Sequence, residues 1–568
     1  MSSNLLLAVF SAVLSGLSIP NELFLYGCWP LGFISLCPLY IALCRAKSPG
    51  RAAVTMGTFG ALQHAITSYW LFFYKDFALW TIGATTVAYF FVYGLAGLYA
   101  SFLLRSDARA FRPFIFALFW VCFEYIKSTG FLGYPWGLIP YSMTSIPVML
   151  QIADITGVYG VSFMLALSSA AAGELALEVG HAAPQQRATT LTIVDMGGGA
   201  GGGLVGGGAR GSDQRLGNTF VFCAFLVLLT LGYGVYSQGR TYASKGSVRM
   251  LLVQQNTDPW LAGEKAAIAS NLTQANTTLE ENRARGGAPV DMTVFSETSL
   301  RRPYKDFKSW YWENPKERPL IPYILSSDAP LLTGAPVVLD WETESMTNSV
   351  ILISKEGNLV DSYAKMHPVP FAEAIPFWEY GWFRTFMQQV VGLDSGWTMG
   401  NRFTLFTVPL HAKPGASVAF CTPICFEDAF ADLCRRYILL GADLLVNLTN
   451  DSWSRTKSAQ IQHWAIARIR AIENRRTLVR STNSGVTCVV GPRGEVLFEM
   501  PQFQPYAAIV DVPVFYSDAM TIYTKYGDWF SWLCLIGVVI LAARDFIKAR
   551  GRWPSESLAA PLTRPLNR

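Results

Sequence analysis

The sequence contains few charged residues for its length. Asp, Glu, Lys and Arg make up 15% of the 568 residues, against roughly 25% in an average soluble protein. Hydrophobic residues make up 51%, which excludes an intrinsically disordered chain, since disorder requires low hydrophobicity and high charge. The formal net charge is only +5, so there is no dominant basic face and a nucleic-acid partner is not expected. Ten cysteines are too few for a disulfide scaffold, and what remains is a membrane protein that carries a further domain.

The amino-terminal segment lacks basic residues. The first Lys or Arg is Arg45, whereas a secretory signal peptide needs a basic segment before its apolar core. We therefore expect the first apolar stretch to be retained. The segments that are long or apolar enough to be considered as membrane spans are 4–19, 24–44, 52–73, 77–104, 114–126, 157–177, 219–236 and 529–543. The alternative for a short segment is a buried helix of a soluble domain.

Positive charges are unevenly distributed among the loops. Lys and Arg cluster after the second and fourth segments and in the tail after the last, whereas the alternate loops have almost none. Because short loops rich in Lys and Arg stay in the cytoplasm, this distribution predicts eight spans with both termini in the cytoplasm. It divides the chain into a seven-span membrane domain (1–239), an extracytoplasmic domain (240–525), and a final span with a basic cytoplasmic tail (526–568).

A glycine-rich stretch interrupts the membrane domain. The connection 178–218 contains the runs 197–203 and 206–208, which are glycine except at Ala200. A glycine-rich loop that cradles phosphate follows a strand, precedes a helix and usually carries a lysine, and none of these features is evident here. The sequence therefore predicts a flexible cytoplasmic linker.

Residues 248–512 have the pattern of a soluble α/β domain. Short β-branched or apolar runs alternate there with polar helical segments, which is typical of α/β layers. About 270 residues suffice for one sizeable hydrophobic core. The predicted strands are 248–255, 292–295, 331–339, 349–354, 418–424, 444–448, 477–481, 487–490 and 507–512, and helical patterns cover 262–284, 428–440 and 458–475.

Cys425 is the candidate nucleophile. It closes the apolar run 417–425, and a helical pattern follows. A nucleophile at such a turn is exposed, and neighbouring backbone N–H groups can hold an oxyanion. The alternatives are a buried structural cysteine and a metal site with Cys421 and Cys434, which lacks the usual close cysteine pair. A disulfide with Cys421 is excluded, because residues four apart on a strand are separated by about 13 Å.

A cysteine nucleophile needs a base. No histidine of the domain has a local signature with Cys425, but a carboxylate can take the same role. Glu297 ends the short strand 292–297, and Lys365 follows the strand 349–354 after a turn. Each alone is typical of a solvated rim, whereas a base, a cation and a nucleophile at three strand ends form a coherent catalytic hypothesis.

The same residues lie in motifs that resemble the nitrilase superfamily. The motifs are Ser296-Glu297-Thr298, Tyr363-Ala364-Lys365 with the stretch 369–373, and Ile424-Cys425-Phe426-Glu427. They occur in the order and spacing of its Glu-Lys-Cys triad. Further stretches closely resemble its membrane-bound branch, the bacterial apolipoprotein N-acyltransferases. These stretches are 134–136, 157–161, 254–256 with the nearby Trp260, 447–453, 462–463, 468–471 and 480–487. The resemblance covers nearly the whole chain, from the membrane half through the outer domain to the final span.

The resemblance implies a multi-span α-helical membrane domain joined to an α/β, nitrilase-like αββα sandwich. It also implies transfer of a fatty acyl chain from a phospholipid to the N-terminal amine of a diacylglyceryl-cysteine apolipoprotein, through a thioester on the cysteine. Glu297 would act as the base and Cys425 as the nucleophile, while Lys365 would stabilise the oxyanion and lower the thiol pKa. The implied supporting residues are Glu373 and Glu427, and the implied substrate-binding residues are Trp260, Phe426 and Trp453.

The surroundings of the reaction are implied as well. The enzyme would be a multi-pass protein of the bacterial inner membrane with its catalytic domain on the periplasmic side. Its partners would be the membrane, a phospholipid donor and a diacylated apolipoprotein acceptor, and no metal, organic cofactor or nucleic acid is implied. Two departures bear on substrate fit: many family members have Tyr where this chain has Phe426, and Ala-Trp-Phe-Gly where it has Ser452-Trp453-Ser454-Arg455.

Two other functions remain open on the sequence alone. A membrane-tethered amidase or nitrilase would share the three residues and would transfer the acyl group to water rather than to an amine. A transporter or receptor with a ligand-binding outer domain would not need them. Few charges within the spans and no evident inverted repeat weaken the second alternative.

The segment 377–387 is dense in aromatic residues and contains Arg384. Aromatic residues with a cation are typical of a membrane interface. We hypothesise an arm that dips into the outer leaflet beside the site, and the alternative is a loop that packs on the core.

Overall fold

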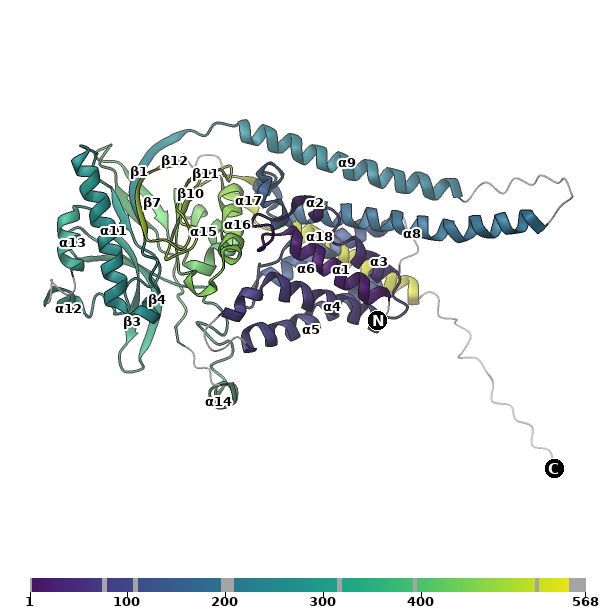
Figure 1. The fold of residues 1–568 in the computed structure, drawn as a ribbon, viewed down its shortest axis with the longest axis horizontal. Helices are drawn as coiled ribbons and strands as arrows, with labels where there is room; N and C mark the ends of the chain where they lie inside the picture. Colours follow the sequence, from purple (N-terminus) through teal and green to yellow (C-terminus); the bar gives the residue numbers. More distant parts are fainter. Residues whose placement is uncertain are drawn as a thin grey trace, which may run out of the picture.

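The computed structural model describes residues 3–73, 79–105, 111–195, 209–313, 319–391, 396–515 and 520–550. Figure 1 shows two parts, a helical part built from the two ends of the chain and an α/β part built from its middle. The α/β part, called the outer domain below, lies at one end of the helices (Figure 1). The predicted fold class, a multi-span helical domain joined to a nitrilase-like α/β domain, is confirmed.

The helical part consists of long helices and a few single turns. Its helices are α1 (Ser3–Ser18), α2 (Trp29–Gly32), α3 (Cys37–Cys44), α4 (Pro49–Thr67), α5 (Thr85–Leu103), α6 (Arg112–Ser128), α7 (Ala153–Thr156), α8 (Tyr159–Asp195), α9 (Ala209–Gly239), α17 (Ile522–Tyr526) and α18 (Trp529–Arg550). Glycines allow close approach between helices α4 and α5. A Cβ on Gly60 would lie 2.1 Å from Tyr93 Cγ, so these helices pack as small-residue interfaces do in membranes.

Among the described residues, four helices are long and apolar enough to cross a membrane. They are Thr81–Leu103, Tyr159–Val179, Gly217–Gly239 and Trp529–Ile547, and they coincide with the predicted spans 77–104, 157–177, 219–236 and 529–543. Shorter apolar helices cover Ser3–Ser18 and Trp29–Cys44. The number of spans and the side of the membrane on which each part lies stay predictions.

The structure differs from the predicted segments at three places. Segment 24–44 is helical only from Trp29 and breaks before α3, whose first turn contains Pro38; proline lacks an N–H and starts a helix rather than continuing one. Helix α4 ends at Thr67, and the rest of segment 52–73 forms the 3-10 turn η1 (Tyr69–Phe73). Within the connection 178–218, α8 continues to Asp195 and α9 begins at Ala209, while the glycine runs lie outside the described residues.

The outer domain contains two six-stranded sheets. The first has the order β12-β1-β2-β3-β4-β5 and the second the order β11-β10-β9-β8-β7-β6. Their strands are β1 (Ser244–Gln254), β2 (Met292–Val294), β3 (Leu331–Asp340), β4 (Ser345–Ile353), β5 (Leu359–Ala364), β6 (Phe406–Pro409), β7 (Ser417–Cys421), β8 (Leu444–Thr449), β9 (Thr477–Thr482), β10 (Cys488–Val490), β11 (Val496–Glu499) and β12 (Tyr506–Phe515).

Strand β1 shows how the layers are stacked. Successive side chains of a strand point to opposite faces. Met250 and Leu252 belong to the core between the sheets, whereas Leu251 and Val253 pack with residues of α11 (Glu264–Ala284) on the outer face. On the far side, α15 (Ala431–Leu439) and α16 (Lys457–Asn474) cover the second sheet. The layers are therefore helix, sheet, sheet, helix, which is the αββα sandwich that the resemblance implies.

The predicted elements of this domain are present, and three strands were missed. Strands β5, β6 and β11 are short and largely polar or exposed, with little apolar pattern to reveal them. Helices α12 (Lys308–Glu313) and α13 (Leu320–Ser327) were also not predicted. Strand β7 ends at Cys421 and not at Ile424 as predicted, because Pro423 has no N–H to donate to the ladder.

Buried polar contacts join the outer domain to the helical part. Arg475 Nη2 lies 2.7 Å from Asp154 Oδ2, and Arg475 Nη1 donates to Gln151 Oε1 over 2.6 Å. Tyr233 OH of α9 donates to the same Asp154 carboxylate over 2.8 Å. Arg468 Nη1 donates to the Thr144 carbonyl over 2.9 Å. Charged groups buried this way need good partners, so these contacts fix one orientation of the outer domain on the helices.

Candidate active site

Cys425 opens a short 3-10 turn, η8 (Cys425–Ala429), shortly after β7. Its φ is +49°, in the left-handed region that non-glycine residues rarely adopt. Asn447 Nδ2 donates to the Cys425 carbonyl over 3.1 Å and to the Pro423 carbonyl over 3.0 Å, so β8 holds this turn in place. A strained turn that neighbouring residues hold is typical of a functional position.

Glu297 lies just beyond β2 and is buried, with 4% of its surface exposed. Its Oε1 accepts from Asn348 Nδ2 over 2.9 Å and from Lys365 Nζ over 3.4 Å. Its Oε2 accepts from the Asn450 backbone N–H over 2.9 Å. Donors from three different segments therefore fix the orientation of this carboxylate.

Lys365 directly follows β5 and is 2% exposed. Its Nζ lies 2.8 Å from Glu373 Oε2 and 3.4 Å from Glu297 Oε1. Glu373 also accepts from the Val369 N–H over 2.7 Å and from Asn348 Nδ2 over 3.0 Å. A buried ammonium requires such pairing, and here one cation holds two carboxylates in a common site.

Burial and mutual charge set the protonation of these groups. Burial raises the pKa of the Glu297 carboxyl, although Lys365 and the hydrogen-bond donors act in the opposite direction. Burial alone would lower the pKa of Lys365, but Glu297 and Glu373 outweigh it and hold that pKa well above its usual range. Lys365 therefore stays charged over the whole range in which Glu297 titrates.

Lys365 lowers the pKa of the Cys425 thiol, as expected, but its effect is not the largest. Burial, followed by the Glu297 carboxylate, raises the pKa of Cys425 well above its usual value, and Lys365 opposes this rise only in part. The charge of Lys365 is shared with two carboxylates, which is why it does not dominate. Cys425 is thus a neutral thiol at rest, and a thiolate forms there only if a base accepts the proton.

Glu427 joins the turn of Cys425 to the segment after Lys365. Its carboxylate accepts from the Ile424 N–H over 2.7 Å, the Met366 N–H over 2.7 Å and the His367 N–H over 2.9 Å. It is completely buried, and burial raises its pKa to about 7. Three backbone donors on one carboxylate hold the nucleophile turn at a fixed distance from the segment that carries the cation.

The three predicted substrate-binding residues fall into two groups. Phe426 stacks on Trp136 of the helical part with ring centroids 5.5 Å apart, and Trp453 contacts Trp70 with centroids 5.4 Å apart. Trp260 lies elsewhere, beneath the guanidinium of Arg301 at 4.6 Å. It lines a shallow hollow together with Thr298, Leu300, Arg301, Ala335, Pro336, Asn348 and Trp397. The structure therefore places two of the residues against the helical part and the third beside the Glu297 donor Asn348.

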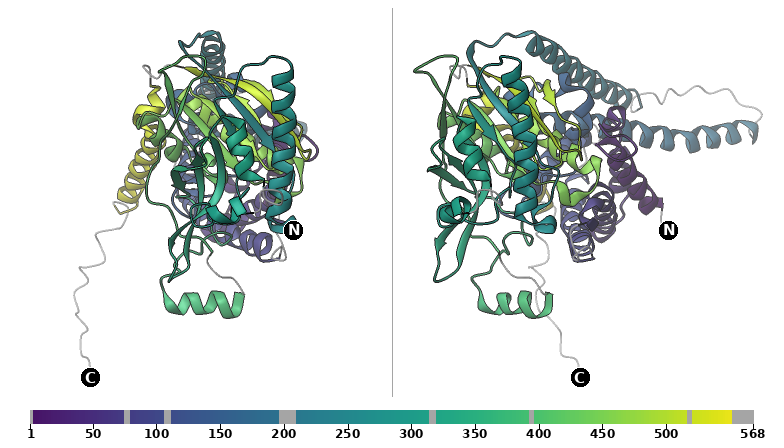
Figure 2. Two further views of the ribbon diagram at one scale, coloured as in Figure 1. Left: turned by 90° about the vertical axis from the view of Figure 1, so that its left-hand side faces the viewer. Right: turned by 60° about the vertical axis from the view of Figure 1, so that its left-hand side comes forward.

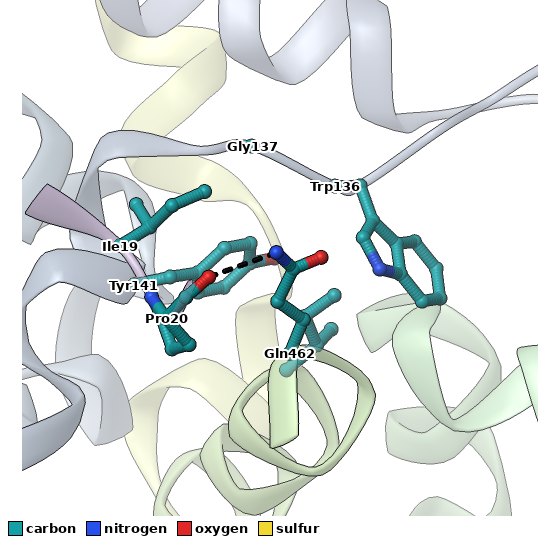
Figure 3. Close-up of a pocket in the computed structure, with 7 residues that line it drawn as sticks. Ile19, Pro20, Trp136, Gly137, Tyr141 and Gln462 are labelled. Carbon is teal, nitrogen blue, oxygen red and sulfur yellow. Dashed lines mark hydrogen bonds between the residues drawn. The ribbon is translucent and has the colours of Figure 1, made fainter. Parts of the chain in front are cut away.

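Helix α16 forms the boundary between the two parts next to this site. Figure 3 shows Gln462 of α16 donating to the Pro20 carbonyl, over 2.8 Å, with Trp136 alongside. The other side of the same amide accepts from Trp70 Nε1 over 2.9 Å. These contacts hold loops of the helical part against α16, next to the place where Trp136 stacks on Phe426.

Several residues of the site were not assigned a role from the sequence. Asn348, which donates to both Glu297 and Glu373, lies on β4 one residue before the predicted strand. Its neighbours Thr347 and Ser349 are polar too, so the sequence pattern did not single it out. Asn450, Asp451 and His463 lay in recognised motifs, but nothing in the motifs revealed that Asn450 donates to Glu297 or that Asp451 contacts His463.

Gly334 of β3 gives a test of how closely Glu297 is held. A Cβ there would lie 2.4 Å from the Thr298 N and 2.7 Å from the Glu297 Cα. Gly334→Ala is expected to push this segment away, lowering the free energy of unfolding by about 1–3 kcal/mol. We also expect slower alkylation of Cys425 by iodoacetamide, followed by intact mass. Gly381→Ala is the matched control, since nothing lies within 4 Å of a Cβ there; equal melting and equal alkylation of both variants would refute the tight packing.

All ten cysteines are free thiols. Among the described residues, no group of three or more His, Cys, Asp or Glu side chains is arranged to hold a metal ion. Cys421 and Cys434 are completely buried and lie near backbone carbonyls, at 3.7 Å from the Leu444 O and 4.0 Å from the Glu427 O. They pack as small hydrophobic residues do.

Two family models match the chain. The model of the apolipoprotein N-acyltransferase N-terminal domain matches residues 11–171, and the carbon-nitrogen hydrolase model matches residues 252–518. The crystal structure of an amidase from Nesterenkonia sp. is similar to half of the chain (50%, and 95% of that structure), with 16% identity and a TM-score of 0.32.

Two curated relatives match over nearly the whole length. Apolipoprotein N-acyltransferase 2 of Treponema pallidum is 38% identical over 554 residues, which cover 93% of this chain and 92% of the relative. Apolipoprotein N-acyltransferase 2 of Treponema denticola is 36% identical over 542 residues, which cover 95% and 96%. The chain therefore belongs to the apolipoprotein N-acyltransferase family.

Proposed function

We propose that this chain transfers a fatty acyl chain from a phospholipid to the N-terminal amine of a diacylglyceryl-cysteine apolipoprotein, through a thioester on Cys425. The observation that carries the proposal is the convergence of buried Glu297 and Lys365 on the strained turn of Cys425. Relatives named apolipoprotein N-acyltransferases over nearly the whole chain support the substrate class.

The first half of the reaction forms the thioester. Glu297 accepts the proton of the Cys425 thiol, and the thiolate sulfur attacks the ester carbonyl of the phospholipid. The C–S bond forms, the ester C–O bond breaks, and Glu297 returns the proton to the departing lysophospholipid oxygen. The raised pKa of Glu297 suits this double role, because a group that both accepts and donates works best with a pKa near the operating pH.

The second half transfers the acyl group to the acceptor. The lipoprotein amine attacks the thioester carbonyl, the C–N bond forms and the C–S bond breaks. Glu297 accepts the proton of the amine and returns it to the Cys425 sulfur. The cycle therefore ends with the same neutral thiol and the same carboxylate with which it began.

Lys365 and the backbone after Cys425 stabilise the oxyanion of both steps. An ammonium has three N–H donors, and two of those of Lys365 point at Glu297 and Glu373. The third supplies the oxyanion donor together with the backbone N–H groups near Phe426. Glu373 and Glu427 act as positioning groups, since they hold Lys365 and the segment next to it.

The surroundings suit lipid substrates. The site lies where the outer domain meets apolar helices, and Phe426 and Trp453 face the helical part, so we assign them to the acyl chains. We assign Trp260 to the polar part of a substrate, because it lines an open hollow beside Asn348. We place the protein in the bacterial inner membrane, with the catalytic domain on the periplasmic side, from the distribution of Lys and Arg in its loops.

The aromatic segment 377–387 adds to this picture. Trp382, Phe377 and Tyr380 expose 74%, 56% and 51% of their surfaces, which is not the behaviour of a core-packing loop. The helical segment that contains α14 (Gly381–Phe386) stands away from the rest of the molecule in both views of Figure 2. Its insertion into the outer leaflet stays a prediction.

Intact-mass spectrometry of the full chain with phospholipid tests the proposal. We expect a fatty-acyl adduct on the native chain and none on Cys425→Ala, and loss of the adduct when a diacylated lipopeptide with a free amine is added. Discharge by water at the same rate without the amine would identify a hydrolase instead. No adduct on the native chain, or an adduct on both chains, would remove Cys425 from its role and favour a ligand-binding protein.

A further inference from the structure

A buried cluster of four charged groups lies behind the nucleophile turn. His463 of α16 contacts two carboxylates: its Nδ1 lies 2.9 Å from Asp451 Oδ1, and its Nε2 lies 2.9 Å from Asp428 Oδ1. Arg480 of β9 pairs with Asp428 and lies 3.5 Å from Asp451 Oδ2. None of the four side chains is more than 7% exposed. Two cations and two anions thus form a neutral cluster that is shielded from water.

The geometry determines the protonation of His463. A neutral imidazole carries one N–H and can donate at only one of its nitrogens. Here both nitrogens face a carboxylate oxygen, so both donate and the ring is an imidazolium. Burial lowers its pKa and Arg480 opposes the charge, but Asp451 and Asp428 outweigh both and raise the pKa to about 9. The charged and titratable groups that face the ring are Asp428 of η8, Asp451 after β8 and Arg480 of β9.

The two carboxylates belong to the two sides of the proposed reaction. Asp428 lies in η8, the turn that begins at Cys425. Asp451 follows Asn450, whose backbone N–H donates to Glu297 Oε2 over 2.9 Å. The imidazolium is therefore a direct polar connection between the segment that carries the nucleophile and the segment that orients the base.

The helical part reaches the same ring. The indole of Trp136 lies 5.4 Å from the His463 ring and stacks at 5.5 Å on Phe426, the residue after Cys425. One indole thus covers both the cluster and the nucleophile turn. A change in the position of the outer domain relative to the helices would therefore move the turn of Cys425 and the cluster together.

We propose that His463, held between Asp428 and Asp451, is a positioning residue for acyl transfer: it keeps the turn of Cys425 in register with the loop that orients Glu297. This inference rests on the proposed function and adds a group that touches neither substrate nor reacting atoms. Such a group acts on the rate of the chemical step, because a displacement of about 1 Å between reacting groups costs on the order of 100-fold in rate. It has no reason to change the affinity for the donor.

The test measures thioester formation by rapid-quench intact mass, with the full chain in lipid nanodiscs and phosphatidylethanolamine as donor. We expect His463→Gln to lower the maximal acylation rate by about 100-fold and to leave the half-saturating donor concentration within about twofold. The native rate is expected to fall above a pH of about 9, as the imidazolium loses its proton, and His463→Gln is expected to lack this alkaline limb. His411→Gln is the matched control, because His411 also contacts a carboxylate, Asp291 at 2.8 Å, but is 40% exposed.

Charge balance separates positioning from simple damage. His463→Gln leaves two buried carboxylates against one guanidinium, whereas Asp428→Asn/His463→Gln restores one of each. We expect the double variant to regain at least about tenfold in rate over His463→Gln, as coupled neighbours do in a double-mutant cycle. Where His463→Gln does not fold, the double variant and the native pH profile decide. Three results would overturn the inference: a His463→Gln rate within about threefold of native, a change in the half-saturating donor concentration alone, or a native rate that is flat up to about pH 10. Absence of any adduct on the native chain would instead overturn the proposed function.

Discussion

Glu297→Gln is expected to reduce acyl-enzyme formation by about 10³-fold, the range in which a general base contributes. The physical reason is the state of the nucleophile: Cys425 is a neutral thiol because burial and the Glu297 charge hold its pKa high. An amide cannot accept the proton, so the variant lacks the base that generates the thiolate. In the native chain the rate is expected to rise with pH through the pKa of Glu297, which burial raises above the usual carboxyl range, and this rise is expected to disappear in the variant.

The measurement is the rate of appearance of the acyl adduct between about pH 4 and pH 8, a range that begins near the usual carboxyl pKa and extends above it. Glu281→Gln serves as the matched control, since Glu281 is exposed on α11 and forms a surface ion pair with Arg285, at 3.1 Å. The Asn450 N–H loses its acceptor if the new amide nitrogen faces it, at a cost of about 1–3 kcal/mol in stability. A melting curve therefore accompanies each rate. A folded Glu297→Gln chain that forms the adduct at the native rate would assign the base role to another group.

Lys365→Met is expected to have an effect of similar size on activity and a larger one on stability. The methionine removes the cation between the Glu297 and Glu373 carboxylates. Asn348, which donates to both, then remains between them. Removing one partner of a buried ion pair costs about 3–5 kcal/mol. The remaining carboxylates respond by taking up a proton, so the pKa of Glu297 rises further and the base is lost near neutral pH.

The pH dependence of stability follows from the sign of that shift. A carboxyl whose folded pKa lies above its unfolded value contributes stability that is fully present below the unfolded pKa and is lost as pH rises through the folded pKa. Lys365→Met is therefore expected to melt at a higher temperature near pH 5 than near pH 8, relative to the native chain, in which Lys365 stays charged throughout. Thermal unfolding in detergent at the two pH values measures this. Lys265→Met, an exposed position on α11, is the control, and an unchanged pH slope in Lys365→Met would show that Lys365 does not balance the carboxylates.

The outer domain was largely predictable because its strands are short apolar runs between polar helices. The run 292–295 placed Glu297 at a strand end, and the turn at Cys425 followed from its position after 417–424. Family motifs then connected the two with Lys365. The pattern did not reveal that Asn348 contacts two carboxylates. Asn348 lies far from Glu297 and Glu373 in sequence, and it meets them only through the pairing of β3, β4 and β5.

The protonation of Cys425 was predicted only in part: Lys365 does lower the thiol pKa, but burial and Glu297 raise it by more. Proximity of a lysine predicts a lowered thiol pKa, but the net effect also depends on how deeply Cys425 is buried and on how much of the lysine charge is already paired. Neither quantity is local in sequence. The helical part shows the same limit. Hydropathy identified its long helices, but it did not show that α4 ends at Thr67 or that Trp70, just beyond it, donates to Gln462 of the outer domain, 392 residues away.

The pairing of β1 with β12 has a consequence for how the molecule is assembled. The two strands are antiparallel, with Ser244 opposite Phe515 and Gln254 opposite Tyr506, so the chain enters and leaves the outer domain at neighbouring points. A unit whose ends lie side by side can be inserted into another protein without stretching either one. The outer domain has the architecture of an insertion between two helices of the bundle, α9 and α18. Because its two ends pair with each other, the outer domain can be exchanged between proteins of this architecture as one unit, without a change in the order of the helices.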